Sequence, residues 1–403
     1  MPHNPRDDGT VTAAQRPGFA DADAAEFLAA HLAPRSTADG VSLLGAGAED
    51  DAALDEGRAF LRALAPRGYA VPSWPAEYGG MGADPATAGR VADLLARHDT
   101  PDLYPFLVGL ALVGPTLLAH GTREQCAGWL PPIARGEEIW CQLFSEPGAG
   151  SDLAGLAARA ERDGELWRVS GQKVWSSRAH YAQWGLLLTR TDPDLPKHAG
   201  ITAFGLDMRT AGVDVRPLRQ MNGDAHFNEV FLDGAVVRDE DRIGDIGEGW
   251  AVALTTLAHE RGALGGGGGL GGAEVLAMFG ERGAGSRAVH RQDAADAFAR
   301  MQAGRWTAAR ARAGGDERAG AGAKIRYADV LRRVAGLAVA LDGPGGVAGP
   351  PDDWTTVFVT APSVSIRGGT DEIQRTVIAD RVLRLPPEPR VDKGIPFRDV
   401  PRS

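Results

Sequence analysis

The feature that most constrains the fold is a change in the spacing of apolar residues, which occurs near residue 140 and reverses after residue 244. Outside this stretch, apolar side chains recur every three or four positions, as they do in helices with one buried face. Within it they alternate, or form short runs separated by Gly, Asp and Pro, which is typical of strands. The sequence therefore predicts an α+β fold, mostly α: a helical N-terminal domain, a middle antiparallel β-barrel or sandwich, and a C-terminal helical bundle.

Approximate bounds of the elements and domains follow from this pattern. The clearest predicted strands are 166–170, 185–189, 201–206, 213–217 and 229–233. In the helix predicted after residue 244, a stripe typical of an amphipathic helix is formed by Trp250, Leu254, Leu257 and Leu264. The predicted domains are a disordered N-terminus (1–20), a helical domain (21–139), a β-barrel domain (140–244), a four-helix-bundle domain (245–385) and a tail (386–403).

Composition excludes several classes of function. The net charge of −10 argues against a nucleic-acid-binding protein, which needs a basic surface. The chain has no uninterrupted apolar run of about 18 residues, so no membrane span is expected, and its polar start lacks the apolar core of a signal peptide. Cys126 and Cys141 form no CxxC motif, and the histidines show no metal-ligand spacing. We therefore expect a cytoplasmic protein with free thiols and no metal.

Two motifs rich in glycine and hydroxyl groups occur in the predicted β region. The first is Trp140-Cys-Gln-Leu-Phe-Ser-Glu-Pro-Gly-Ala-Gly-Ser-Asp152, and the second is Gly171-Gln-Lys-Val-Trp-Ser-Ser177. Hydroxyls and backbone amides in such a turn bind ring oxygens and phosphates, and an indole offers a flat wall. A flavin needs this combination of hydrogen-bond donors and aromatic surface.

Together the motifs resemble the flavin-binding signatures of the acyl-CoA dehydrogenase family, and the resemblance covers residues 24–385, including the order of the domains. It implies FAD as the cofactor. It also implies that Ser145 bonds the flavin pyrimidine edge, that Ser151 lies near the pyrophosphate, and that Ser177 bonds flavin N5 beside Trp175. The implied FAD contacts are Phe144, Ser145, Gly150, Ser151, Trp175, Ser176, Ser177, Thr370 and Glu372.

The resemblance also implies a catalytic base. In the commonest family pattern a glutamate precedes Gly-Thr near the C-terminus, but Gly368 stands there, and glycine accepts no proton. The isovaleryl and long-chain branches carry the base before an arginine on the helix after the β-domain, which matches Glu260 and Arg261. Glu260 would then remove the α-proton of an acyl thioester, Arg261 would orient it, and the Gly368 backbone N–H would bind the thioester oxygen. Alternatively, Glu260 is a helix-surface acid paired with a neighbouring arginine.

The implied activity is FAD-dependent α,β-dehydrogenation of an acyl thioester, bound to CoA or a carrier protein, with an electron-transferring flavoprotein as acceptor. An acyl-CoA oxidase or another flavoenzyme of the same fold is an alternative. The family also implies a homodimer or homotetramer. Two segments depart from the family pattern at its subunit contacts, 280–287 and 341–346, so a heteromer with a related subunit is a further alternative. The tail resembles that of actinobacterial members, and the run Gly265–Gly269 has no assigned role.

Overall fold

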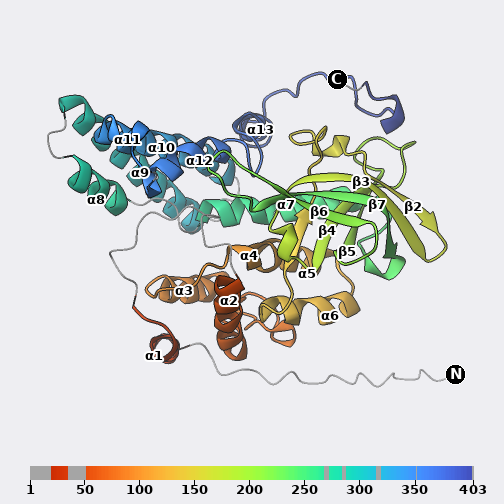
Figure 1. Ribbon diagram of the computed structural model, residues 1–403. Coiled ribbons are helices and arrows are strands. Elements are labelled where there is room, and N and C mark those ends of the chain that lie inside the picture. The colour runs from red at the N-terminus through yellow and green to blue at the C-terminus, as the bar shows by residue number, and fades with distance from the viewer. Residues whose placement is uncertain are drawn as a thin grey trace.

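The computed structural model describes residues 20–34, 51–266, 272–283, 287–314, 319–350 and 352–401. For 261–266, 272–274, 311–314 and 319–321 it describes the backbone alone. The N-terminus predicted to be disordered lies outside the described residues, except for Ala20. Helices, strands and helices follow one another along the chain in the predicted order, which confirms the predicted fold class (Figure 1).

The N-terminal helices lie at the bottom of Figure 1. Their bounds are α1 Asp21–His31, α2 Asp51–Leu64, α3 Pro85–Leu95, α4 Tyr104–Leu107, α5 Gly114–His120 and α6 Arg123–Ala134, with 3-10 turns η1 Ala65–Arg67 and η2 Ala76–Tyr78. The π-helical segment η3, Val108–Val113, connects α4 to α5. Phe60, Leu64 and Val91 are buried, as their helical spacing predicts. Thr122 caps α6 in a reciprocal arrangement with Gln125, which satisfies two otherwise free backbone N–H groups.

The middle of the chain forms one mixed sheet. Its strands are β1 Trp140–Leu143, β2 Arg159–Asp163, β3 Leu166–Ser177, β4 Trp184–Arg190, β5 Ile201–Asp207, β6 Val213–Leu218, β7 Phe227–Arg238 and β8 Arg242–Ile243, with 3-10 turns η4 Leu153–Gly155, η5 Ala179–Tyr181 and η6 Asp239–Asp241. The strand order is β6-β7-β3-β2-β4-β5-β8, and β1 pairs with β4. Both β1 and β2 pair with β4 in parallel, whereas the sequence predicted an antiparallel domain.

The N-terminal helices and the sheet share their hydrophobic cores. One buried cluster joins Leu61 and Phe106 to Trp167 and Phe204 of the sheet. A second joins α5 and α6 to the other face of β4 and β5, where Trp129, Trp140 and Trp184 pack with ring centroids 5.2 to 5.6 Å apart. A Cβ at Gly205 would lie 3.0 Å from the Trp129 ring, so a side chain there would require the ring to shift. The position of the sheet is therefore fixed by packing against helices far away in sequence.

The C-terminal helices form a separate buried cluster. Their bounds are α7 Gly249–Gly266, α8 Gly272–Arg282, α9 Ala288–Gly314, α10 Ala319–Asp342, α11 Gly345–Ala348, α12 Asp353–Val364 and α13 Asp371–Val377, followed by the π-helical η7 Ile378–Val382. The cluster is built from Val275, Met278, Leu331, Val334, Trp354 and Val357, among others. The glycine run begins inside α7, which ends at Gly266, and its remainder lies outside the described residues.

Helix α7 is buried on a face that includes only part of the predicted stripe: Trp250 and Leu257 pack partly buried against the second cluster, and the Leu264 side chain lies outside the described residues. Val252, Ala253 and Thr256 are fully buried, whereas Leu254 is 37% exposed. The buried face lies against α5, where the Thr256 and Thr116 hydroxyls are 2.9 Å apart, and these positions are occupied by small or β-branched residues. Small and β-branched side chains on this face allow α7 to lie close to α5.

The tail after residue 385 leaves the helical bundle and returns to the sheet. It contains one 3-10 turn, η8 Phe397–Asp399, and Pro396 forms a β-bridge with Pro196 in the β4–β5 connection. The predicted end of regular structure near Pro386 is therefore followed by a segment that docks on the β-domain, beside the end of the chain in Figure 1.

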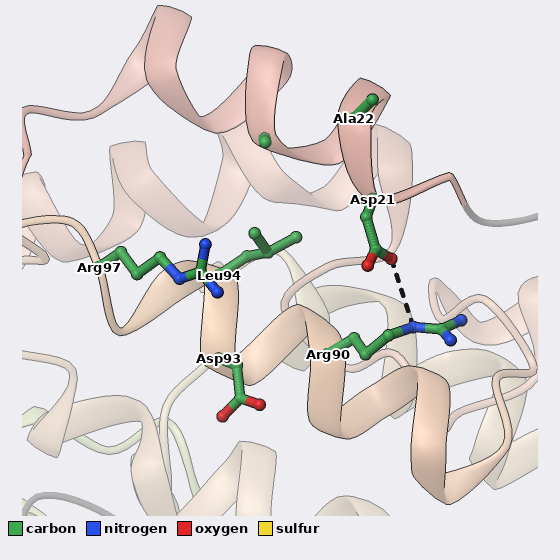
Figure 2. A pocket seen from close by; sticks show the side chains of 7 residues that line it. Asp21, Ala22, Arg90, Asp93, Leu94 and Arg97 are labelled. Carbon is green, nitrogen blue, oxygen red and sulfur yellow. Dashed lines mark ion pairs between the residues drawn. The ribbon is translucent and has the colours of Figure 1, made fainter.

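A cavity of about 320 Å³ lies between α1 and α3, at the left of Figure 1 and away from the strands. Figure 2 shows its charged rim, where Asp21 and Arg90 form an ion pair of 3.3 Å near Asp93 and Arg97. The two acidic and two basic side chains of the rim have no net charge, so the rim favours neither an anionic nor a cationic ligand. Within the described parts of the chain, no helix has the length and apolarity that a bilayer crossing needs, and no cluster of metal-ligating side chains occurs.

Candidate functional site

A buried ion pair connects the two sequence motifs. The Lys173 ammonium on β3 is fully buried and lies 2.8 Å from a carboxylate oxygen of Glu146, which is itself 9% exposed. The same carboxylate accepts hydrogen bonds from the backbone N–H groups of Ala157 (2.7 Å) and Ala158 (2.9 Å). Burial lowers the pKa of Lys173, and the Glu146 carboxylate opposes that change. Each charge thus has partners that compensate for the loss of water.

Backbone contacts align the motifs further. The N–H of Val174 donates to the carbonyl of Ser145 (2.9 Å), and Lys173 also donates to the carbonyl of Phe144 (3.1 Å). The Ser145 hydroxyl is half-buried at this junction. Phe144 is buried and contributes to the core that carries the first motif. The first motif therefore lies directly against the last residues of β3.

A β-bulge directs Trp175 out of the sheet. Between the pairs Lys173–Val230 and Ser176–Asn228, β3 advances by three residues and β7 by only two. Trp175 has a φ of +60°, a left-handed conformation rare outside glycine, and its side chain is 56% exposed. Bulges commonly redirect a side chain beside a functional site. The exposed indole packs edge-on against Phe227, with ring centroids 5.8 Å apart.

Two serines follow Trp175 and lie differently. Ser176 is fully buried, and its hydroxyl has no hydrogen-bond partner among the described residues. Ser177 ends β3 half-buried, and the Tyr104 hydroxyl at the start of α4 donates to it over 3.5 Å. The π-helical segment η3 begins four residues after Tyr104. Such segments are frequent at functional sites.

Charged and aromatic groups surround the end of β3. Arg178 is buried, and its guanidinium carbon lies 5.4 Å from the Tyr104 ring centroid. The backbone N–H of Arg178 donates to the backbone carbonyl of His226 (2.8 Å). Burial, followed by the nearby Arg178 charge, lowers the pKa of His226 to about 4. The imidazole is therefore neutral at pH 7. Sequence reasoning missed Arg178, Tyr104 and His226, although Arg178 directly follows Ser177.

The Gly368 turn faces the same region. Arg367 is among the charges that lower the pKa of His226, so the two residues lie near each other. Gly368 and Gly369 both have positive φ, +67° and +82°, which residues with side chains rarely adopt. The Gly368 carbonyl accepts a hydrogen bond from the Gln374 side chain (3.1 Å). This bond fixes the turn before α13.

The other predicted residues lie on separate elements. Glu260 is half-buried in α7; Arg261 follows it on the same helix, and its side chain lies outside the described residues. Thr370 caps α13 by accepting from the Ile373 N–H (3.2 Å). Glu372 lies in the first turn of α13, where backbone and Thr370 hydrogen bonds lower its pKa.

The glycine-rich turn leaves open space. Glu146 and Ala149 exchange both backbone hydrogen bonds, at 3.1 and 3.0 Å, which closes a tight turn. A Cβ built on Gly148 or Gly150 would meet nothing within 4 Å, and Ser151 is exposed. Backbone groups of this turn are thus accessible to a ligand.

Comparison with known proteins places the chain in a family. Three family models match it in turn: the acyl-CoA dehydrogenase N-terminal domain over residues 21–137, the middle domain over 141–235 and the C-terminal domain over 247–383. The acyl-CoA dehydrogenase IpdE1 of Mycobacterium tuberculosis is 38% identical over 364 residues, which are 86% of this chain and 92% of that protein. The chain belongs to the acyl-CoA dehydrogenase family.

Other relatives extend the comparison. The acyl-CoA dehydrogenase FadE34 of Mycobacterium tuberculosis is 43% identical over 80% of this chain, but the chain spans only 46% of its length. Among solved structures, the Tcur3481-Tcur3483 steroid ACAD has a TM-score of 0.72 at 26% identity, covering 91% of this chain and 97% of that one. The ChsE4-ChsE5 complex from Mycobacterium tuberculosis has a TM-score of 0.69 at 25% identity, covering 82% and 90%.

Family members are FAD-dependent flavoproteins, and the chain is an acyl-CoA dehydrogenase-type oxidoreductase. The site has features that suit a flavin. A flat indole projects from the sheet, the buried Ser176 hydroxyl has no partner among the described residues, and an open glycine turn offers its backbone. A ring system beside Trp175 with phosphates at the turn would use all three features. The residues present therefore fit FAD.

The ion pair between the motifs should dominate the stability of the site. Removing one partner with Glu146→Gln or Lys173→Met leaves a buried charge unpaired, so each variant should lose about 3–5 kcal/mol of unfolding free energy. The double variant should lose clearly less than the sum of the two, because neither charge is then left alone. Urea denaturation of the four proteins measures this coupling.

A matched control comes from an exposed ion pair in the same sheet. Glu161 pairs with Arg159 over 3.0 Å, and both side chains are more than 60% exposed. Glu161→Gln should change the unfolding free energy by no more than about 0.5 kcal/mol. Additive losses for the Glu146 and Lys173 variants would contradict the coupling.

Proposed function

We propose that this chain catalyses the FAD-dependent α,β-dehydrogenation of an acyl thioester, with Glu260 as the base. The observation that carries the proposal is the junction where Val174 bonds Ser145 and the bulge exposes Trp175. This junction brings the exposed indole close to the half-buried Ser145 of the first motif. FAD bound on it would supply the acceptor for the β-hydrogen, as it does in this family.

Residues of the chain itself would remove the α-proton and stabilise the thioester oxygen. Glu260 would take the α-proton, and its half-buried position on α7 reduces its contact with water. The Gly368 N–H would donate to the thioester oxygen as negative charge develops there. Because position 368 holds a glycine with positive φ, no carboxylate competes with Glu260 for the proton. Arg261 follows Glu260 and would orient it.

The acyl group and the electron acceptor are part of the same proposal. Relatives named for a steroid favour a bulky acyl group over a short linear one, and the carrier would be CoA. The electron acceptor would be an electron-transferring flavoprotein, as is usual in the family.

Replacing the base tests this proposal. Glu260→Gln keeps the size of the side chain but accepts no proton, so FAD should stay bound while flavin reduction by a thioester slows by at least about 10²–10⁴-fold. Anaerobic mixing with a panel of acyl-CoA thioesters, followed by flavin absorbance, measures the rate. Glu248→Gln, an exposed position just before α7, should reduce at the wild-type rate. Near wild-type reduction in the Glu260 variant would show that another residue is the base.

A second proposal concerns the oligomeric state of the protein. Large apolar residues are exposed on the C-terminal helices, including Leu276 (56%), Trp306 (71%) and Phe358 (47%), which favours contact with another subunit. In the family such contacts form homodimers or homotetramers. Two of the similar solved structures are named for two proteins, and one of these is described as a complex. We infer that either a second copy or a related chain covers these helices.

The colour of the purified protein separates the two assemblies. A homo-oligomer should be yellow when the chain is purified alone, with about one FAD per subunit. A heteromer should be colourless alone and become yellow on co-expression with a related acyl-CoA dehydrogenase chain. The molecular mass in solution, measured together with the flavin absorbance spectrum, distinguishes the two assemblies. A monomer with full FAD and full activity would contradict both assemblies.

A further inference from the structure

The tail after α13 contacts the β4–β5 connection along several residues. The N–H of Phe397 donates to the Leu195 carbonyl (2.9 Å), and the N–H of Arg398 donates to the Pro193 carbonyl (3.1 Å). Arg398 also pairs with Asp194. Phe397 is only 8% exposed, so an aromatic side chain far beyond the helical bundle is buried against the β-domain. We call residues 386–401 the strap.

Lys197 connects the strap to the glycine-rich turn. Its ammonium is 6% exposed and lies 2.8 Å from both carboxylate oxygens of Asp152, the last residue of the first motif. On its other side it lies 2.5 Å from the Asp392 carboxylate of the strap. Hydrogen bonds from Arg390, and then from Lys197, hold the pKa of Asp392 well below its usual range. One buried cation thus joins the turn to the strap.

Arg190 makes a second connection. Its guanidinium, buried at the end of β4, donates to the carbonyls of Ala154 (2.7 Å) and Leu156 (3.2 Å), just after the turn, and to that of Lys197 (2.6 Å). The Phe397 ring covers this guanidinium, with its centroid 3.8 Å from the Arg190 central carbon. A buried cation over an aromatic face is held more strongly than an exposed one.

We propose that the strap positions the turn that receives the FAD pyrophosphate, with Asp392 and Phe397 as positioning residues that act through Lys197 and Arg190. The proposal rests on the function proposed above, because Gly150 and Ser151 are the implied phosphate contacts. The glycines of the turn face open space, so a Cβ at Gly148 or Gly150 would contact nothing. Two cations hold its C-terminal side, and the strap restrains both of them. A restrained turn needs less ordering when a ligand binds, so the strap strengthens binding.

Two substitutions and a control test the proposed role of the strap. They are made in the homo-oligomer or in the heteromer, depending on which of the two binds FAD. Asp392→Asn removes the negative charge that pairs with Lys197 at nearly constant shape, and Phe397→Ala removes the ring over Arg190. Each should raise the FAD dissociation constant by about 3- to 10-fold, the range expected from losing one such contact. Val391→Ala, at a position 87% exposed, should leave it unchanged. Titration of FAD into the apo-protein, followed by flavin fluorescence, measures the constant at temperatures where urea unfolding shows every variant to be folded.

Amide hydrogen exchange gives a readout that does not require FAD. In the apo-protein, exchange in residues 148–156 should be faster in the Asp392 and Phe397 variants than in wild type and the Val391 variant. If both variants keep the wild-type exchange rates and FAD affinity, the strap does not position the turn. The flavin proposal would then remain intact. Faster exchange in a protein whose wild type binds no FAD in any assembly would support the restraint of the turn but overturn its proposed role in binding the cofactor.

Discussion

The buried pair between Glu146 and Lys173 is the interaction on which the site depends. It places one charge from each motif in a region without water, so each motif needs the other to compensate its charge. The same lysine binds the Phe144 carbonyl, and the neighbouring Val174 binds Ser145. This alignment puts the glycine-rich turn beside the bulge that exposes Trp175. The geometry proposed for the flavin therefore follows from one ion pair and the backbone bonds around it.

The surrounding architecture holds this junction from three directions. The N-terminal helices share cores with both faces of the sheet and bring Tyr104 to Ser177. The C-terminal helices bring the Gly368 turn near His226, and the strap returns to support the other end of the first motif through Lys197. Rigid elements thus position a site whose own turn has few contacts, which is a common arrangement for binding loops.

The sequence predicts the parts of the fold that have a clear period. The strand predicted at 201–206 is found at Ile201–Asp207, and that at 213–217 at Val213–Leu218. Strand β2 was missed because only one of its five residues is buried, which leaves no alternation to detect. Residues of the two sequence motifs meet at one junction in the structure. The contact of Tyr104 with this junction could not be predicted. Tyr104 lies 73 residues from Ser177, and only the packing of helix on sheet brings the two together.

The bulged Trp175 would form the wall of a flavin site rather than part of a protein core. Measuring FAD affinity and apo-protein stability together for Trp175→Ala distinguishes these two roles. We expect weaker FAD binding and an altered flavin spectrum, with the unfolding free energy of the apo-protein almost unchanged, because Trp175 is 56% exposed. Unchanged FAD affinity together with a loss of about 3–5 kcal/mol of stability, as for a buried tryptophan, would contradict this expectation.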